Sequence, residues 1–322
     1  MFLIIGSTTL DLIHSGFPQL PTPRGDEFTV DSLVFCADPV RMRFGGNGAN
    51  SAYVLARLGA PVALGSAIGK DPAGDLLYRP LVDVGVDMQG LVRHPTAATS
   101  VTTVITDASQ QRLAFHHAGS SHAYAPDDLP PTIRRRATAV LVASFTLFLR
   151  WRPLGFAELL RQVKAQGGIT ALDIGPAIGQ PVTLDEIAFL LPDVDYFVCN
   201  AHELAVCTAV EETSEGIALG MAQILAAGAA CAVIKQGASG ALVQEGETGA
   251  PVAVPGFAIQ PASTVGAGDS FNAGLLYAIE QGTDVVTAAR FANGVAALVL
   301  TAQDGVLGAP TAAQVNTFLP PA

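Results

Sequence analysis

The sequence predicts an α/β fold: a doubly wound, mostly parallel sheet with helices on both faces and a small β-sheet lid. Two observations support this prediction. Short apolar runs alternate with longer helical stretches, and two segments rich in proline, valine and threonine interrupt that alternation. Strand–helix alternation is typical of a sheet covered by helices on both faces. Because the sequence holds no internal repeat and no linker, we expect a single domain over residues 1–322.

Five short runs are largely apolar on consecutive residues, as expected for strands buried on both faces of a parallel sheet. They are Phe2–Ile5, Ala139–Ala143, Ile169–Asp173, Tyr196–Cys199 and Cys231–Lys235. The helical stretches Ser51–Leu58, Phe156–Ala165 and Ile217–Ala227 lie between them, and glycines at or near their ends mark helix stops. Gln244–Pro255, with glycines in its middle, is predicted to be a hairpin.

The two interrupting segments predict the lid. His14–Phe44 contains four prolines and short apolar stretches, and Ala98–His117 contains the mixed valine and threonine run Thr99–Thr106 followed by Arg112–His116. Valine and threonine favour strands on half-exposed surfaces. We therefore expect residues 14–44 and 98–117 to pair into a small sheet over a site.

Composition excludes several classes of protein. Acidic residues outnumber basic ones, 28 against 17, and this charge argues against a nucleic-acid partner. The longest apolar stretch, Ala137–Leu149, is too short to cross a bilayer, so no membrane partner is expected. The four cysteines have no Cys-x-x-Cys spacing, which favours free thiols and a cytoplasmic location.

The most informative segment is the glycine-rich turn that contains Gly266, Ala267 and Gly268 and precedes a predicted helix. Small residues at a helix N-terminus let an anion reach backbone amides that have no partner within the helix. Asp269 lies in the first turn, where a carboxylate can accept a proton from a substrate hydroxyl. A plain helix cap is the alternative interpretation.

A second glycine-rich segment, from Gly45 through Gly46 to Asn50, also precedes a predicted helix. Its glycines let the backbone approach a ligand closely, and the Asn50 amide can both donate and accept hydrogen bonds with hydroxyls. A turn followed by a helix cap remains the alternative.

Both segments resemble the signatures of the ribokinase-like (PfkB) carbohydrate kinases: Gly45–Asn50 the amino-terminal one, and Thr264–Gly274 the carboxy-terminal one. Four further segments occur in the order of that family, so the resemblance covers nearly the whole chain. They are Gly6–Asp11, Asn200–Glu203, Lys235–Gly240 and Phe291–Asn293.

This resemblance implies an ATP-dependent phosphotransferase that phosphorylates a hydroxyl of a sugar or a related small molecule. Asp269 would be the catalytic base, and Gly266, Ala267 and Gly268 would form the anion hole. The sugar would contact Asp11, Gly45, Gly46 and Asn50. The nucleotide would contact Asn200, Lys235, Gly237, Gly240 and Asn293, with Mg²⁺ near Asn200 and Glu203.

Three departures from the family pattern bear on the cation and the substrate. Ser263 and Val265 stand where many relatives carry aspartate and threonine, which weakens the case for an activating monovalent cation such as potassium. Ser144–Thr146 lacks the glutamate that ribokinases proper use to touch the sugar, and Asn47 replaces a frequent lysine. Both changes argue against ribose itself.

Three other activities stay open at this point. A nucleoside kinase of the same family needs an apolar slot for the base, which Phe17, Phe28, Phe35 and Phe115 can supply. A non-catalytic sugar- or nucleotide-binding module and a pterin or vitamin kinase are further alternatives. The presence of Asp269 argues against the non-catalytic module.

The lid pattern also predicts a homodimer. Val101 and Thr103 fall on one face of a strand, and Thr102 and Val104 on the other, so both faces carry apolar surface. One face can close over the substrate while the other packs on a second subunit, as the lids of ribokinase-like dimers do.

Four further groups of residues have either a functional or an ordinary structural interpretation. His116, His117 and His122 suggest a metal site, a lid contact or a solvated loop. Asp173 ends a strand and is either near Mg²⁺ and phosphate or a turn cap. The arginines at 134–136 are expected to be a solvated helix end, and Trp151 a packing residue.

Overall fold

The computed structural model describes residues 1–17, 20, 38–107, 109, 112–176, 181–262 and 265–320. Within them, the main sheet has nine strands in the order β13-β12-β11-β10-β9-β8-β1-β4-β5. Their bounds are β1 Phe2–Ile5, β4 Val62–Gly69, β5 Leu91–His94, β8 Ala139–Val142, β9 Ile169–Asp173, β10 Tyr196–Asn200, β11 Cys231–Lys235, β12 Gly240–Glu245 and β13 Val252–Pro255. The strands from β11 to β5 are parallel, and the β12–β13 hairpin is antiparallel. The predicted mostly parallel sheet is confirmed.

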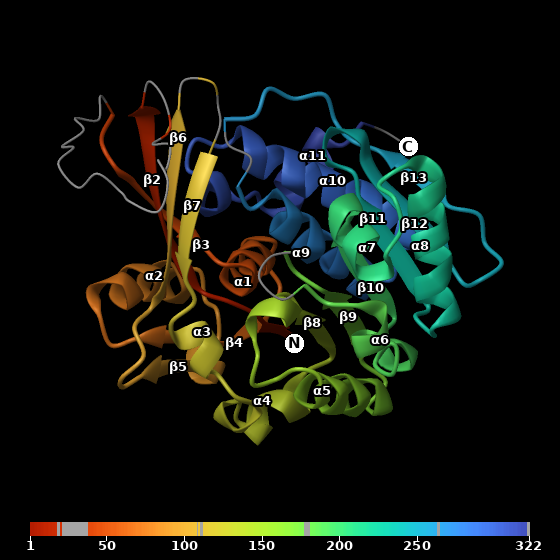
Figure 1. Cartoon of the computed structure of the whole chain (residues 1–322), viewed down its shortest axis with the longest axis horizontal. Helices are drawn as coiled ribbons and strands as arrows, with labels where there is room; N and C mark the ends of the chain where they lie inside the picture. Colours follow the sequence, from red (N-terminus) through yellow and green to blue (C-terminus); the bar gives the residue numbers. More distant parts are fainter. Residues whose placement is uncertain are drawn as a thin grey trace, which may run out of the picture.

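Helices cover both faces of this sheet (Figure 1). One face carries α1 Asn47–Arg57, α2 Pro72–Asp83, α9 Ala267–Glu280, α10 Val285–Thr301 and α11 Ala312–Phe318. The other carries α3 Ser120–Ala123, α4 Pro131–Arg136, α5 Leu154–Ala165, α6 Leu184–Ile187, α7 Ala201–Thr208 and α8 Ser214–Ala226. Strand β1 is apolar throughout because its side chains enter both cores: Phe2 and Ile4 join one, and Leu3 and Ile5 the other.

Helix α1 begins at Asn47, one turn before the predicted start at Ser51. The glycine at position 48 suggested a loop, but it serves close packing instead. A Cβ atom at Gly48 would lie 2.4 Å from the carbonyl carbon of Gly6, which follows β1. Glycine therefore lets the first turn of α1 rest against the end of that strand.

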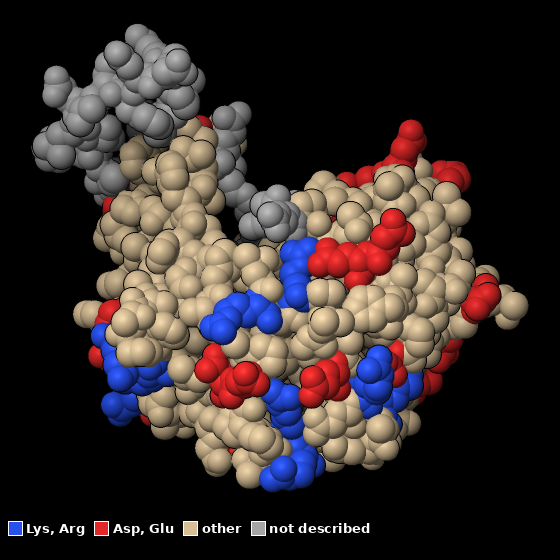
Figure 2. Space-filling view, turned by 60° about the horizontal axis from the view of Figure 1, so that its bottom comes forward, with Lys and Arg blue, Asp and Glu red and all other residues tan. Residues whose placement is uncertain are grey.

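The lid is a separate four-stranded sheet in the order β3-β2-β6-β7. Its strands are β2 Thr9–Phe17, β3 Arg41–Gly45, β6 Ser100–Asp107 and β7 Arg112–His117. The central pair β2–β6 is parallel and the two outer pairs are antiparallel. In Figure 1 the lid rises from one end of the body, and in Figure 2 it stands off the body. The small sheet predicted outside the main one is confirmed, although residues 18–19 and 21–37 lie outside the described part.

Several smaller predictions can be compared with the structure. The first hairpin strand starts at Gly240, before the predicted Gln244. Trp151 is fully buried and stacks on Phe156, as expected of a packing residue. The solvated helix end expected at 134–136 is wrong for Arg134, whose side chain is 14% exposed and lies over the Trp151 ring. Arg136 is more exposed and pairs with Asp87 at the end of α4. None of the described helices is long and apolar enough to cross a bilayer.

Candidate active site

The two glycine-rich segments meet at the carboxylate of Asp269. Asn50 on α1 donates a hydrogen bond from Nδ2 to Asp269 Oδ2, at 2.7 Å, and Ser51 Oγ donates to the Asp269 carbonyl oxygen at 3.2 Å. Burial raises the pKa of the Asp269 carboxyl, while the Asn50 hydrogen bond and the charge of Lys235 oppose that rise. A buried carboxylate is thereby held in one orientation at the start of α9.

The turn before α9, predicted to be an anion site, lies next to Lys235. Gly266 adopts a left-handed conformation, with φ of 80°, and α9 begins at Ala267. A Cβ atom placed on Gly268 would lie 3.4 Å from Lys235 Nζ. The first amides of α9 and the ammonium of Lys235 therefore face the same small space.

Lys235, at the end of β11, belongs to a buried polar network. Its Nζ donates to Asp173 Oδ2 at 2.8 Å and to Asn272 Oδ1 at 3.2 Å, and Asn272 Nδ2 donates to Asp173 Oδ2 at 2.5 Å. Burial by itself lowers the pKa of Lys235, but the charges of Asp173 and Glu203 outweigh it and the pKa is raised. Lys235 therefore stays charged.

Asp173 acts as the turn cap that was one of its two expected roles, and it also pairs with Lys235. Its Oδ2 pairs with Lys235, and its Oδ1 accepts a hydrogen bond from the Gly175 amide at 2.8 Å, as a turn cap does. Asn272 was not predicted at all. Its position in the TVGAGDSFNAG segment, three residues after Asp269, was the available signal.

Asn200 and Glu203 cap the N-terminus of α7 reciprocally. Asn200 Oδ1 accepts from the Glu203 amide at 2.7 Å, and Glu203 Oε2 accepts from the Asn200 amide at 2.8 Å. Burial and the nearby charge of Asp173 raise the pKa of Glu203 to about 7. Within the described residues, no three His, Cys, Asp or Glu side chains are arranged to hold a metal, and this includes the three histidines near residue 120.

A cavity of about 690 Å³, here called the hairpin cavity, lies between the β12–β13 hairpin, α9 and α10. Its polar lining includes four residues predicted to contact nucleotide: Lys235, Gly237, Gly240 and Asn293. Asn200 is not part of this lining. The Asn293 amide donates to the carbonyls of Val254 and Pro255, both at 3.1 Å, and so holds β13 against α10.

The rest of the hairpin cavity is apolar and was not predicted. Phe257, Ile259 and Leu300 line it, together with Phe271 of α9. The first two lie in the proline- and glycine-rich connection after β13, which has no strand or helix periodicity to mark it. Such a wall suits the flat face of a heteroaromatic ring.

A second cavity of about 540 Å³, here called the lid cavity, lies between the lid and the starts of α1 and α9. Four residues with a role expected at the acceptor line it: Asp11, Gly46, Asn50 and Asp269. Gly45 is not part of this lining. A Cβ atom at Gly45 would lie 2.5 Å from Asp11 Oδ2, so only glycine leaves room for that carboxylate.

Burial raises the pKa of Asp11 to about 6; a hydrogen bond with Thr102 lowers it, and the charge of Asp269 raises it further. Thr102 and His116 lie opposite one another in the β6–β7 register, and Asp11 lies opposite Thr102 on β2. The Thr102 Oγ1 and His116 Nδ1 atoms are 3.1 Å apart. A hydrogen-bonded row of three side chains therefore crosses the lid and lines the cavity.

The phenylalanines considered for a nucleoside slot do not line the lid cavity in the described part of the chain. Phe115 is 53% exposed and lies next to His116 on β7, so it points to the outer face of the lid. Phe17 is also outside the lining, and Phe28 and Phe35 lie outside the described residues.

The two cavities meet at the first turn of α9, because Gly266 and Asp269 line one while Ala267 and Gly268 line the other. Residues 25–312 match the pfkB family of carbohydrate kinases. The chain belongs to this family. The expected resemblance is confirmed, and the protein is a carbohydrate kinase of the ATP-dependent ribokinase-like group.

Curated relatives span nearly the whole chain. A ribokinase of Haemophilus influenzae is 27% identical over 294 residues, covering 91% of this chain and 92% of its own. A nucleoside kinase of Methanothermobacter thermautotrophicus is 25% identical over 301 residues, covering 92% and 88%. The structure of Arabidopsis thaliana ribokinase complexed with ribose and ATP has a TM-score of 0.84 at 23% identity, covering 100% and 99%. This last likeness confirms the ribokinase-like fold.

The departures from the family pattern fall in different places. Ser263 lies outside the described residues, whereas Val265 and Asn47 line the lid cavity. Ser144 accepts a hydrogen bond from the Ser7 amide at 3.1 Å, so its hydroxyl holds the connection between β1 and β2.

Proposed function

We propose that this kinase transfers the terminal phosphoryl group of ATP, bound in the hairpin cavity, to a hydroxyl of a sugar-like molecule in the lid cavity. The observation that carries the proposal is that both cavities open on the first turn of α9. Phosphoryl transfer requires mainly positioning and charge stabilisation, with donor and acceptor in line. The starts of α1 and α9 supply a common surface for both substrates.

Asp269 is the proposed proton acceptor. As the acceptor oxygen bonds to phosphorus and the bond from phosphorus to the leaving ADP oxygen breaks, the hydroxyl proton passes to the Asp269 carboxylate. In a loose transition state this proton leaves late, so an ordinary carboxylate suffices. The hydrogen bond from Asn50 orients the carboxylate toward the acceptor.

Gly266, Ala267 and Gly268 are the proposed anion hole. Their position supports this role, since the free amides of the first turn lie beside Lys235 Nζ. Amides and an ammonium held in advance stabilise charge on the transferring group without reorganisation. Lys235 is fixed for this task by Asp173 and Asn272.

Substrate hydroxyls are the proposed partners of Asp11, Asn50 and the backbone of Gly45 and Gly46. Asn50 supports this directly, because its Oδ1 is buried and has no hydrogen-bond partner within the described residues. An unpaired buried acceptor is costly, and a substrate hydroxyl can satisfy it. The same amide donates to Asp269, so it links substrate binding to the base.

Mg²⁺ is the metal ion proposed to bind near Glu203 together with ATP. Three carboxylates (Asp173, Glu203 and Asp269) influence one another's charge here, against the single ammonium of Lys235. This excess of negative charge fits a hard divalent cation, which proteins hold through one or two carboxylates, waters and substrate phosphates. When bound, Mg²⁺ would neutralise phosphate charge. Asn200, occupied in capping α7, would keep Glu203 in place.

A homodimer through the lid is the proposed assembly. Met42 and Phe115, which are 62% and 53% exposed, fall on the outer face with Leu12 and Thr103 between them in the strand register. Apolar side chains on an open sheet face favour coverage by a second lid. The buried free thiols of three described cysteines support a cytoplasmic location.

The test is an ADP-release screen with ATP and Mg²⁺ over sugars, polyols, sugar acids, sugar phosphates and nucleosides. We expect acceptor-dependent ADP release with at least one sugar-like compound. Release with nucleosides alone would support the nucleoside-kinase alternative. Nucleotide binding without turnover on any acceptor would support the non-catalytic module.

A further inference from the structure

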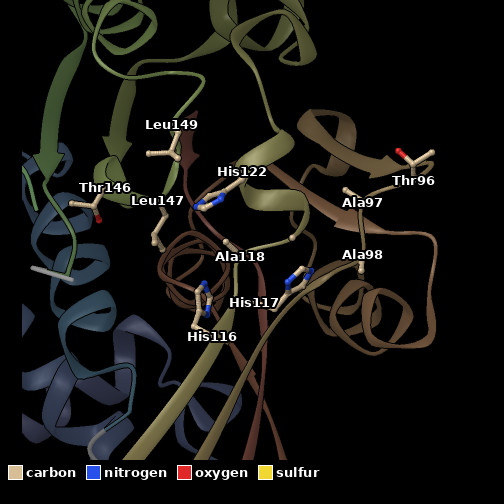
Figure 3. A pocket seen from close by; sticks show the side chains of 11 residues that line it. Thr96, Ala97, Ala98, His116, His117, Ala118, His122, Thr146, Leu147 and Leu149 are labelled. Atoms are coloured by element: carbon tan, nitrogen blue, oxygen red, sulfur yellow. The ribbon is translucent and has the colours of Figure 1, made fainter. Parts of the chain in front are cut away.

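A third cavity, of about 880 Å³, lies beside the lid cavity at the base of the lid. It is lined by the end of β7, the connection between β5 and β6, α3 and the segment around Leu147. Figure 3 shows the rings of His116, His117 and His122 around Ala118, with Leu147 near His122. We call it the histidine cavity.

The histidine cavity adjoins the proposed acceptor site. His116 and Leu147 line both cavities, so these two side chains form the boundary between them. On the lid side, His116 also reaches Asp11 through Thr102. A substrate whose reacting hydroxyl lies at Asp269 can therefore extend past His116 into the histidine cavity.

The chemistry of the lining favours an anion. Its titratable side chains are the three histidines, and its described lining includes no Asp or Glu. Each imidazole can donate an N–H hydrogen bond when neutral and gains a positive charge when protonated. Burial and the charges of His122 and His117 lower the pKa of His116, and an anion bound beside these rings would offset the repulsion between their protonated forms.

Two further groups near the three histidines also favour an anion. Arg150 donates to the carbonyl of Ala123, at 3.0 Å, beside His122. Thr146 lines the cavity and is 94% buried, and its Oγ1 has no hydrogen-bond partner within the described residues. The nearest carboxylate in the hydrogen-bonded row, Asp11, is separated from His116 by Thr102.

We propose that the histidine cavity binds an anionic substituent, a phosphate or a carboxylate, carried by the acceptor away from its reacting hydroxyl. The acceptor class is then a sugar phosphate or a sugar acid rather than a neutral sugar. This inference rests on the proposed function, because it places the reacting end of the same molecule in the lid cavity.

Matched acceptor pairs test the proposal: fructose against fructose 6-phosphate, and glucitol against gluconate. We expect kcat/KM to be at least about tenfold higher for the anionic member of one pair, which distinguishes phosphate from carboxylate. His117→Gln with His122→Gln should raise KM for that acceptor about tenfold and leave the neutral partner within about twofold. His202→Gln, an exposed histidine paired with Glu212 on another surface, is the control.

Direct binding provides a second readout. Calorimetric binding of gluconate and fructose 6-phosphate without ATP tests the cavity independently of turnover, and the double variant should lose it.

These outcomes separate the two proposals. Turnover of neutral sugars with equal or lower efficiency for anionic ones, and no effect of the double variant, would overturn the histidine-cavity proposal and leave the kinase mechanism standing. A preference for nucleosides that the double variant abolishes would also overturn it. Calorimetric binding of an anionic acceptor that the double variant loses, without turnover of any acceptor, would support the cavity and contradict the proposed reaction.

Discussion

The two ends of the site differ in how their polar groups are held. At the hairpin end, Lys235, Asp173 and Asn272 join β11, β9 and α9 through buried hydrogen bonds of 2.5–3.2 Å. At the lid end, Asp11 and His116 stand on a thin sheet whose far face carries exposed apolar side chains. The polar groups of the hairpin end are hydrogen-bonded to elements of the core, and those of the lid end are hydrogen-bonded mainly within the lid sheet.

This difference separates two tasks. Phosphate chemistry is the same for every acceptor, so a rigid, fully paired network can serve it. In the proposed function, acceptor recognition would depend on side chains projecting from the lid, which can change without disturbing the core. We therefore expect substitutions at the hairpin end to damage folding and turnover together, and those at the lid end to alter acceptor choice and assembly.

The largest effect is expected for Lys235→Met. The substitution leaves the Asp173 carboxylate buried and unpaired, which costs about 3–5 kcal/mol of unfolding free energy. Urea unfolding measures this loss. The double variant Lys235→Met/Asp173→Asn removes the unpaired charge and should recover part of the stability without recovering turnover. Equal stability of Lys235→Met and the wild type would show that the pair does not anchor this end.

Asp269→Asn should reduce kcat by at least about 10²-fold, the usual scale for a general base. The fold should survive, because the new amide oxygen can still accept the hydrogen bond from Asn50. Asp284→Asn, at the exposed N-cap of α10, is the control and should keep kcat. Near-normal turnover of Asp269→Asn would show that Asp269 is not the catalytic base.

Stability should fall as pH rises through the range in which Glu203 ionises. Its pKa is raised from 4.5 to about 7 in the folded chain, so the folded state binds the proton more tightly. The contribution is complete below pH 4.5 and is lost by about pH 7, on the order of 2 kcal/mol. Chemical unfolding from pH 4 to 8 should show this slope, and Glu203→Gln should flatten it.

The lid end offers a comparison within the same titration. The pKa of Asp11 is raised from 3.8 to about 6, so the stability that Asp11 contributes is lost at a lower pH than the contribution of Glu203. Asp11→Asn should flatten the slope below about pH 6 and leave the part above it. A slope that neither variant changes would assign the pH dependence to other groups.

A charge on the outer face of the lid should split the proposed dimer. We expect light scattering to report about twice 33.1 kDa for the wild type and the monomer mass for Phe115→Lys at micromolar concentration. Leu219→Lys, at an equally exposed leucine on α8, should remain dimeric. A wild-type monomer would contradict the lid interface.

The smallest effect concerns the monovalent cation. Val265 offers no side-chain oxygen, and the serine at position 263 is neutral. Exchange of sodium for potassium should therefore change the rate by less than about threefold, or about 0.7 kcal/mol in activation free energy. A saturable potassium activation beyond this would mean that backbone carbonyls complete a cation site.

The candidate residues at the glycine-rich turns could be selected from the sequence, whereas Asn272 was not selected. Asp269 and Asn50 stood out because glycines mark the places where backbone approaches a ligand, although their direct contact spans 219 positions. Asn272 carried no such mark. Its partners Asp173 and Lys235 become neighbours only through the sheet order, which local periodicity does not encode.

The fold was predictable for a similar reason. Strand β1 is apolar on every residue, and β11 on all but its last, Lys235, because both faces are buried. Strand β4 contains two glycines and a serine and was not recognised. The roles of Asn200 and Glu203 also needed the structure, since their three-residue spacing fits both a helix cap and a place near Mg²⁺.

The most direct test of the central claim is the product balance by phosphorus NMR with the best acceptor from the screen. If the phosphoryl group passes across α9 to an acceptor in the lid cavity, one phosphorylated acceptor forms for each ADP, with little inorganic phosphate. ADP and inorganic phosphate released at the same rate with and without acceptor would contradict the account, because water would then be the acceptor.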